Sequence, residues 1–224
     1  MARRTKEEAL ETRSRILDAA EVVFHDKGVA NASLEEIAAE ADLTRGAIYW
    51  HFKDKAELFD AMMQRVALPV EDMLERAGGG SPDASPLEVL RRATVEVLLR
   101  TARDARVQRV FDIAYHKCEY VGDAVGVRER HIESQAECLR TIESAMRACV
   151  ESGALPKSVN PREAAIGALS LVSGLIANWV LAPRSFSLER HAHSLVDTWF
   201  RGLAASPSAR SECPLQATLK RLRK

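Results

Sequence analysis

Apolar residues recur every three to four positions along almost the whole chain, whereas strict alternation of apolar and polar residues is almost absent. That interval places apolar side chains on one face of an α-helix and does not suit a strand. Aromatic residues make up only 5% of the chain, and alanine, leucine, valine, glutamate and arginine dominate. This mixture favours helices over strands. The sequence therefore predicts an all-α fold.

Start and stop signals divide this pattern into about nine helices. Gly28 is suited to end the first helix, and a capping box, Ser33-Leu-Glu-Glu36, opens the second. Asn160 followed by Pro161 opens a later helix, and Pro69 predicts a kink in another. The expected helices span residues 6–27, two short segments between 33 and 51, 54–77, 87–103, 105–120, 123–152, 161–182 and 187–204.

The short helices are concentrated at the N-terminal end. We predict a three-helix, helix-turn-helix domain over residues 1–54, joined to a C-terminal helical bundle over residues 55–205. The last residues, 206–224, have the composition of a disordered basic tail. A chain of 224 residues is long enough to bury a substantial core in this arrangement.

Two short helices meet at a tight turn near Ala41-Asp42-Leu43, which is a helix-turn-helix pattern. In such a pair the second helix lies in the major groove of DNA. Arg45 suits guanine O6 and N7 or a phosphate, Gly46 permits close approach, and Lys55 at the start of the next helix suits a phosphate. A helical hairpin with a solvated charged face is the alternative that composition leaves open. The side chains of the second helix expected to be exposed are Thr44, Arg45, Tyr49 and His51.

Charge limits how such a surface can bind. The formal net charge is +0, and residues 1–65 contain ten basic and thirteen acidic side chains. Bulk positive charge therefore cannot hold this chain on nucleic acid. Binding must depend on where a few basic and hydroxyl side chains are placed.

The segment Ser33–Phe59 resembles the DNA-binding signature of the TetR family of bacterial repressors. The run Thr-Arg-Gly-Ala-Ile-Tyr-Trp-His-Phe resembles the AcrR/TtgR-like branch, which represses multidrug efflux pumps, and so do Arg3-Arg-Thr-Lys-Glu-Glu and His116-Lys-Cys-Glu119. The resemblance implies a homodimer that binds a near-palindromic operator in double-stranded DNA. Asp42 stands where the family usually has glycine. The DNA contacts that the resemblance implies are Ser33, Thr44, Arg45, Gly46, Tyr49, His51 and Lys55.

The same resemblance implies a ligand pocket in the C-terminal bundle. Small hydrophobic or aromatic, antibiotic-like compounds are the expected ligands, and binding is expected to shift the population of conformations so that the repressor leaves DNA. The helix that contains Pro69 is expected to transmit this shift. The implied pocket residues are Phe111, Tyr115, Cys138, Ile142, Leu169, Val172, Ser173 and Ala177.

The stretch from Ala164 to Ala182 contains no charged residue and approaches the length of a membrane span. It also contains Ser170, Ser173 and Asn178, and no other such stretch accompanies it. A helix that is apolar all round is either a membrane span or packed on several sides by protein. We expect a central helix that is also buried in the homodimer, and no membrane partner.

Two other classes of function are open to a helical chain with these residues. A helical enzyme or metal-binding protein would use His116, Cys118, Glu119 and His131, but residues two apart point to different helix faces, so they are a poor chelate. No catalytic motif accompanies them, and we expect no enzyme activity, catalytic residue, metal or cofactor. A repressor that senses oxidants through Cys118, Cys138 or Cys149 is the second alternative.

The four cysteines show no regular spacing, and the first residues have no apolar segment typical of a signal peptide. Both observations favour a reducing compartment, so we expect a cytoplasmic protein.

Overall fold

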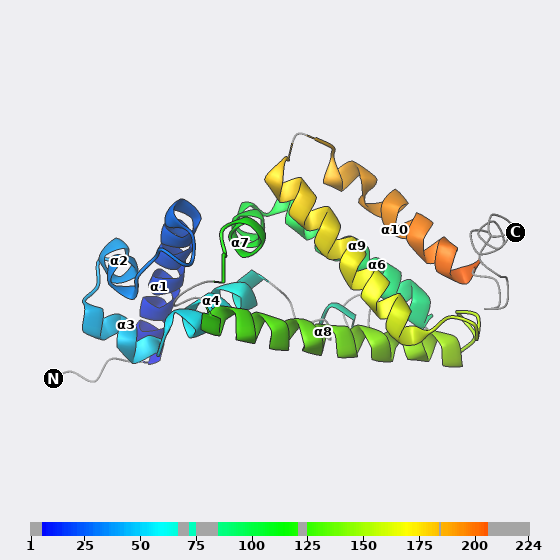
Figure 1. Cartoon of the computed structure of the whole chain (residues 1–224), viewed down its shortest axis with the longest axis horizontal. Helices are drawn as coiled ribbons and strands as arrows, with labels where there is room; N and C mark the ends of the chain where they lie inside the picture. The colour runs from blue at the N-terminus through cyan, green and yellow to red at the C-terminus, as the bar shows by residue number, and fades with distance from the viewer. Residues whose placement is uncertain (1–5, 67–71, 75–84, 121–124, 184, 206–224) are drawn as a thin grey trace, which may run out of the picture.

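The computed structural model describes residues 6–66, 72–74, 85–120, 125–183 and 185–205, and within them it contains helices and no strand. The all-α prediction is confirmed. Figure 1 shows the short N-terminal helices at one end, with the long helices α6, α9 and α10 at the other end. The helices are α1 (Lys6–Lys27), α2 (Leu34–Glu40), α3 (Arg45–His51), α4 (Lys55–Val66), α6 (Pro86–Arg103), α7 (Ala105–His116), α8 (Val125–Glu151), α9 (Pro161–Leu181) and α10 (Leu188–Ala204).

Two predicted helices differ from the structure in their ends. The helix expected to reach residue 120 ends at His116, because the chain turns before Tyr120, whose φ is +48°. The helix expected over residues 54–77 is described only to Val66, so the kink predicted at Pro69 lies outside the described residues. The tail predicted over residues 206–224 lies outside them as well.

The predicted capping signals of the first helices are present. Gly28 adopts a φ of +81°, and its N–H donates to the Phe24 carbonyl at 2.9 Å, which ends α1. The Ser33 Oγ accepts from the Glu36 N–H at 3.2 Å, and the Ser33 N–H donates to Glu36 Oε2 at 2.9 Å. Lys27 Nζ lies 2.6 Å from Glu36 Oε1. This network fixes the angle at which the chain passes from α1 into α2.

A substitution of Glu36 by glutamine tests this network through its pH dependence. The hydrogen bond from Lys27, followed by those from Ser33, lowers the pKa of Glu36 from 4.5 to about 2. A lowered carboxyl pKa stabilises the fold above the unfolded value and stops doing so as pH falls through the folded value. Glu36→Gln is therefore expected to lower the free energy of unfolding at neutral pH, by a difference that shrinks between pH 4.5 and about 2. Urea unfolding across this range measures it, and a difference independent of pH would contradict it.

Buried apolar residues form two clusters that do not follow the predicted boundary at residue 54. The first cluster contains residues of α1, α2, α3, α4 and α7 and of the start of α8. Val110 and Ile113 of α7 lie within it. The second cluster is formed by α6, α8, α9 and α10, and includes Leu98 and Met146. Phe111 packs against both clusters. The division into residues 1–54 and 55–205 stays a prediction, and α7 is the element shared between the two halves.

A group of charged side chains also joins α1 to α4 and α7. Glu21 of α1 is 2% exposed, and its carboxylate oxygens lie 3.3 Å from Arg65 Nη1 and 3.4 Å from Arg106 Nε. Both arginines also pair with Asp18. Burial raises the pKa of Glu21 although Arg106 and Arg65 oppose it. The N-terminal helices are thus attached to the bundle by ion pairs as well as by apolar contacts.

Helix α9 alone among the described helices is long and apolar enough to cross a membrane by length and composition. In the structure it packs against α6, α7, α8 and α10. Against α10 the approach is close, since a Cβ at Gly167 would lie 3.1 Å from the Trp199 ring. Only 28% of its most apolar 18-residue stretch is buried within the single chain. Much of the apolar surface of α9 therefore remains available for another protein surface.

Candidate nucleic-acid interface and ligand cavity

The turn between α2 and α3 presents α3 at the surface. Asp42 adopts a φ of +52°, a conformation that aspartate tolerates better than most residues. Leu43 N–H donates back to the Ala38 carbonyl at 2.8 Å. Thr44 is the N-cap of α3, with its Oγ1 accepting from the Ala47 N–H at 3.3 Å, and Ile48 anchors the helix in the core. The other face of α3 is turned to solvent.

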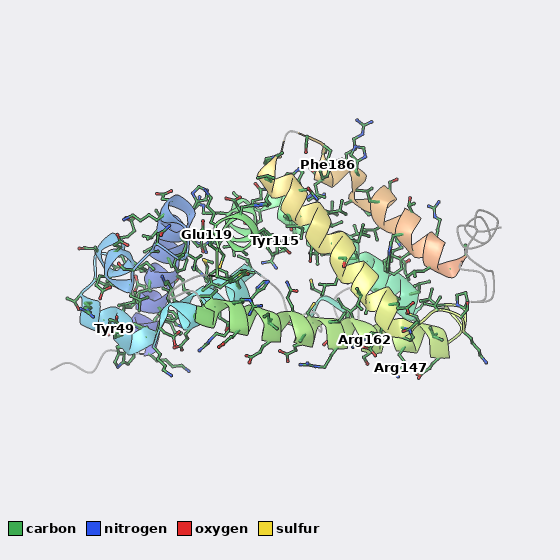
Figure 2. All side chains as sticks on the ribbon, in the orientation of Figure 1. Tyr49, Tyr115, Glu119, Arg147, Arg162 and Phe186 are labelled. Carbon is green, nitrogen blue, oxygen red and sulfur yellow. The ribbon has the colours of Figure 1, made fainter. Side chains whose placement is uncertain are left out.

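The exposed face of α3 brings together four of the predicted DNA-contacting residues. Thr44, Arg45, Gly46 and Tyr49 are all exposed, and Figure 2 shows Tyr49 at the end of the molecule formed by α1 to α4. The only atom near a Cβ added at Gly46 would be Thr44 Oγ1 at 4.0 Å, so the described part of the protein has room for a side chain there. This absence of crowding fits a glycine retained for close approach of another molecule.

Two residues of this surface were missed by the sequence reasoning. Trp50 is 71% exposed and stands edge-on to the half-buried His51 ring, with the centroids 4.5 Å apart. Glu35 of α2 lies beside the first residue of α3, and its Oε1 is 2.9 Å from Arg45 Nε. The position of Trp50, two residues after Ile48 and therefore on another face of the helix, was a signal available in the sequence. The pairing across two helices was not.

Ser33 and Lys55 are placed differently from the expectation. The Ser33 hydroxyl is already bonded to Glu36. Lys55 is 9% exposed, and its Nζ donates to the Ala32 carbonyl at 2.7 Å and to the Ala30 carbonyl at 3.1 Å. In this structure the Lys55 ammonium is therefore engaged by backbone carbonyls inside the fold, and its contact with phosphate stays a prediction.

Replacing Lys55 by methionine distinguishes a structural role of its ammonium from a contact with DNA phosphate. Loss of the ammonium leaves the Ala30 and Ala32 carbonyls without this donor, so we expect the free energy of unfolding to fall by about 2 kcal/mol. The salt dependence of binding to random-sequence duplex DNA should stay as in the wild type. Lys53→Met, at an exposed neighbouring position, is the control and should lower the salt slope without loss of stability. Wild-type stability with a lowered salt slope in Lys55→Met would contradict the structural role and support the phosphate contact.

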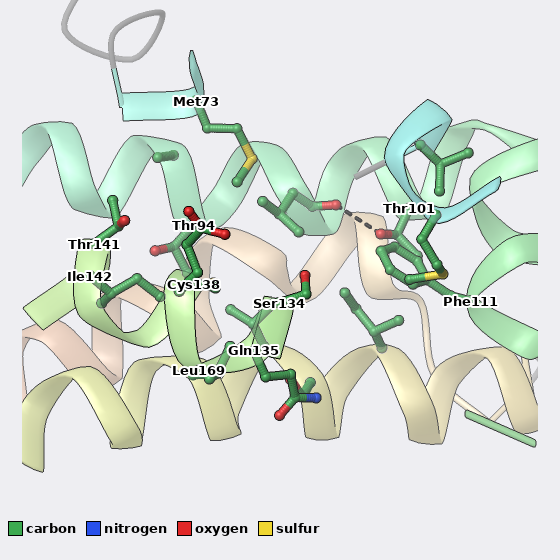
Figure 3. A pocket seen from close by; sticks show the side chains of 18 of the residues that line it. Met73, Thr94, Thr101, Phe111, Ser134, Gln135, Cys138, Thr141, Ile142 and Leu169 are labelled. Carbon is green, nitrogen blue, oxygen red and sulfur yellow. Dashed lines mark hydrogen bonds between the residues drawn. The ribbon is translucent and has the colours of Figure 1, made fainter. Parts of the chain in front are cut away.

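A cavity of about 540 Å³ lies between α4, α6, α7, α8 and α9. Its lining is mainly apolar, and Figure 3 shows Phe111, Cys138, Ile142 and Leu169 among the side chains around it. Its volume is typical of sites for small organic molecules. The predicted pocket residues that line it are Phe111, Tyr115, Cys138, Ile142, Leu169, Val172 and Ser173.

Ala177 is the predicted pocket residue that does not line the cavity. The preceding residue, Ile176, does so instead. The Ala177 carbonyl lies 2.9 Å from His116 Nε2, at the end of α7. One position along a helix rotates a side chain by about 100°. That rotation takes Ala177 away from the cavity, and its backbone joins α9 to α7.

Polar and charged side chains of the cavity were also missed. Asp60 of α4, Arg100 of α6 and Arg130, His131 and Glu137 of α8 line it. Nothing in their local sequence distinguishes them from other solvated charges on helices. Only the meeting of several helices assigns them to one cavity.

Two titratable rings of the cavity favour their neutral forms. Burial raises the pKa of Tyr115, although a hydrogen bond with Ser173 opposes it. Burial lowers the pKa of His131, whose Nε2 lies 2.9 Å from Gln135 Nε2. Neutral donors and acceptors beside apolar walls suit an uncharged or weakly polar ligand.

The cavity and the α3 surface are connected through α4, α7 and α8. Phe59 and Asp60 of α4 line the cavity, and α4 begins at Lys55, separated from the end of α3 by residues 52–54. Helix α8 lines the cavity and also packs on the start of α4, where a Cβ at Gly126 would lie 3.5 Å from the Ala56 Cβ. After α7, the Lys117 carbonyl accepts from the Val29 N–H at 2.8 Å. A change in the cavity therefore has contiguous routes to the helix-turn-helix.

The thiols of Cys118 and Cys149 favour their neutral forms. Burial raises the pKa of Cys118 and raises that of Cys149 to about 11. Cys118 packs against the first apolar cluster and Cys149 lies in the second, while Cys138 faces the cavity. Thiolate is the reactive form, so the environments of Cys118 and Cys149 oppose oxidation. Among described residues, no three His, Cys, Asp or Glu side chains are arranged to hold a metal ion.

Comparison with known proteins agrees with this architecture. Residues 16–62 match the model of bacterial regulatory proteins of the tetR family, and residues 85–204 match the C-terminal region of MAATS-type transcriptional repressors. The HTH-type transcriptional regulator TtgR of Pseudomonas putida is 39% identical over 94% of this chain and 100% of its own length.

Two solved structures have the same fold. NalD, described as the secondary repressor of the MexAB-OprM multidrug efflux pump in Pseudomonas aeruginosa, superposes with a TM-score of 0.80 at 34% identity, covering 89% of this chain and 100% of NalD. SmeT, a repressor from Stenotrophomonas maltophilia solved in complex with triclosan, gives 0.76 at 29% identity, covering 91% and 98%. The chain therefore belongs to the TetR family of bacterial regulatory proteins, which confirms the resemblance inferred from its sequence.

Proposed function

We propose that this protein is a ligand-responsive transcriptional repressor that binds a near-palindromic operator as a homodimer and is released by small hydrophobic or aromatic, antibiotic-like compounds. The observation that supports it most is the combination, in one chain, of an exposed helix-turn-helix surface and a largely apolar cavity of about 540 Å³ joined by α4 and α8. NalD represses an efflux pump and SmeT binds triclosan, so a multidrug efflux operon is the proposed target.

On the DNA side, Arg45 and Tyr49 make the central contacts, with Thr44 donating to phosphate and Gly46 permitting close approach. The half-buried His51 is proposed as a further phosphate contact. Ser33 and Lys55 support the geometry of the surface, because their polar groups are bonded within the fold. Trp50, which is exposed beside Tyr49, joins the set.

Release follows from a shift between two conformations. A ligand in the cavity contacts α4 and α8 directly and favours an arrangement in which α4 displaces the helix-turn-helix. In a dimer the two α3 helices must keep a fixed spacing to enter successive major grooves. A small displacement of each therefore removes both from the operator together.

The dimer is proposed to form through α9 and α10. Part of the apolar surface of these helices is uncovered within one chain, since Ile166 and Leu181 of α9 are 45% and 66% exposed and Leu195 and Trp199 of α10 are only partly buried. Two-fold symmetry lets the same surface of each chain cover the other.

The protein is proposed to act by binding and not by catalysis, because its relatives are regulators. It is proposed to work in the cytoplasm, where it would meet operator DNA.

The decisive experiment couples the two sites. A duplex is first selected from a random library with the purified protein, and its affinity is then measured with antibiotics, plant phenolics and triclosan added in turn. At least one compound is expected to weaken operator binding, and the operator must weaken that compound by the same factor. Failure to select any duplex would overturn the repressor proposal. Selection without release by any compound would overturn the ligand response alone.

A further inference from the structure

We propose that Glu35 determines the base specificity of the DNA contact made by Arg45. This inference rests on the proposed function and adds to it a residue of α2, outside the recognition helix. Glu35 Oε1 lies 2.9 Å from Arg45 Nε, and both side chains are at the surface, 45% and 69% exposed. The ion pair joins the first turn of α2 to the first residue of α3.

The geometry leaves the useful edge of the guanidinium for DNA. A guanidinium is a planar fork with donors on Nε and on two Nη groups. Glu35 engages Nε, and the Tyr49 ring lies under the plane, with its centroid 5.5 Å from Arg45 Cζ. The Nη1 and Nη2 edge is then the one that can donate two parallel bonds to guanine O6 and N7. One edge and one face of Arg45 are held before DNA arrives, so less side-chain freedom is lost on binding guanine.

The charge of Glu35 acts in the opposite direction on other sequences. Its carboxylate is brought close to the DNA surface together with Arg45, and it neutralises much of the attraction between Arg45 and phosphates. Where no guanine is present, nothing compensates for this loss. Glu35 therefore weakens binding to unrelated DNA while it strengthens binding to the correct base, and both effects increase the specificity ratio.

Glu35→Gln tests the inference against a matched control. Glu40→Gln makes the same change of charge on the same helix, and Glu40 forms no ion pair with a described residue. Dissociation constants are measured at one salt concentration for the duplex selected by the wild-type protein and for random-sequence duplex DNA. Glu35→Gln is expected to bind the random duplex more tightly and the selected duplex more weakly, so that the specificity ratio falls about tenfold. Glu40→Gln should leave the ratio unchanged.

A second measurement tests the guanine directly. Guanines of the selected duplex are replaced one at a time by 7-deazaguanine, which lacks the N7 acceptor. At one guanine in each half-site the wild type is expected to lose about tenfold in affinity, and Glu35→Gln markedly less. Equal losses for both proteins at every guanine would overturn the proposal.

Other outcomes are also informative. A rise in affinity for both duplexes by the same factor would mean that Glu35 is only a negative charge near DNA, and would overturn its role in specificity. A fall for both, together with lower stability, would mean a structural role and overturn it as well. If the wild type selects no duplex, the repressor function itself fails, which is a different result from selection with an unchanged ratio.

Discussion

Arg45→Ala is expected to weaken binding to the selected operator by about tenfold to a hundredfold for each recognition helix. A bidentate arginine–guanine pair contributes about 1–3 kcal/mol of discrimination, and a dimer contains two of them. Arg45 is 69% exposed in its side chain and is held by Glu35 and Tyr49 at the surface of α3, so its removal disturbs no core contact. Circular dichroism and the sedimentation of the dimer should stay as in the wild type.

The control for this prediction is Arg147→Ala. Arg147 is similarly exposed and similarly paired, with its Nη2 3.0 Å from Glu143 Oε1, and Figure 2 shows it at the far end of the molecule from Tyr49. It should lose no operator affinity beyond the effect of one removed positive charge. If Arg45→Ala loses no more than Arg147→Ala at the same salt concentration, Arg45 is not a DNA contact.

Ile142→Trp is expected to abolish release from the operator while leaving operator binding intact. Ile142 lines the cavity from α8, and an indole ring there occupies space that a ligand needs. If making room for a ligand costs about 1–3 kcal/mol of packing, ligands should bind about fivefold to 150-fold more weakly, and concentrations that release the wild type should no longer release this variant. Operator affinity should persist because the α3 surface is untouched. The measurement is operator affinity as a function of the concentration of a compound that releases the wild type.

Ile132→Trp makes the same change on the same helix without entering the cavity. Ile132 is 50% exposed and does not line the cavity, so this variant should respond to the ligand as the wild type does. Full release of Ile142→Trp at wild-type ligand concentrations would place the ligand elsewhere. A loss of operator affinity in Ile142→Trp without ligand would mean that filling the cavity itself favours the released conformation.

The parts of the fold that the sequence predicts well depend on contacts between near neighbours along the chain. The Ser33–Glu36 capping box, the Thr44 cap and the Gly28 helix end each involve residues three or four positions apart. The residue types and their spacing along the chain are enough to predict such caps. The same spacing correctly predicted that Arg45 and Tyr49 of α3 are exposed and Ile48 is buried, but it missed the exposure of Trp50, and His51 is half-buried rather than exposed.

The sequence does not reveal placements that depend on a partner from far along the chain. Lys55 has the charge and exposure expected of a phosphate contact until the loop at residues 30–32 folds over its ammonium. Ala177 and Ile176 differ by one position, and only the packing of α9 on its neighbours decides which one faces the cavity. The helix of residues 105–116 ends early where the chain meets the turn after α1, with the Lys117 carbonyl accepting from the Val29 N–H.

The sequence by itself determined that this chain is all helical, that it contains a helix-turn-helix and that bulk charge does not attach it to DNA. Helical periodicity and helix caps depend on residues close together in the sequence, so the sequence alone predicts them. The net charge is a sum over residue types and does not depend on the structure. The tertiary structure decided that Glu35 pairs with Arg45, that Lys55 is buried and that charged groups of three helices, Asp60, Arg100 and Arg130, share one cavity. These are distances between residues on different elements, and they exist only once the helices are packed.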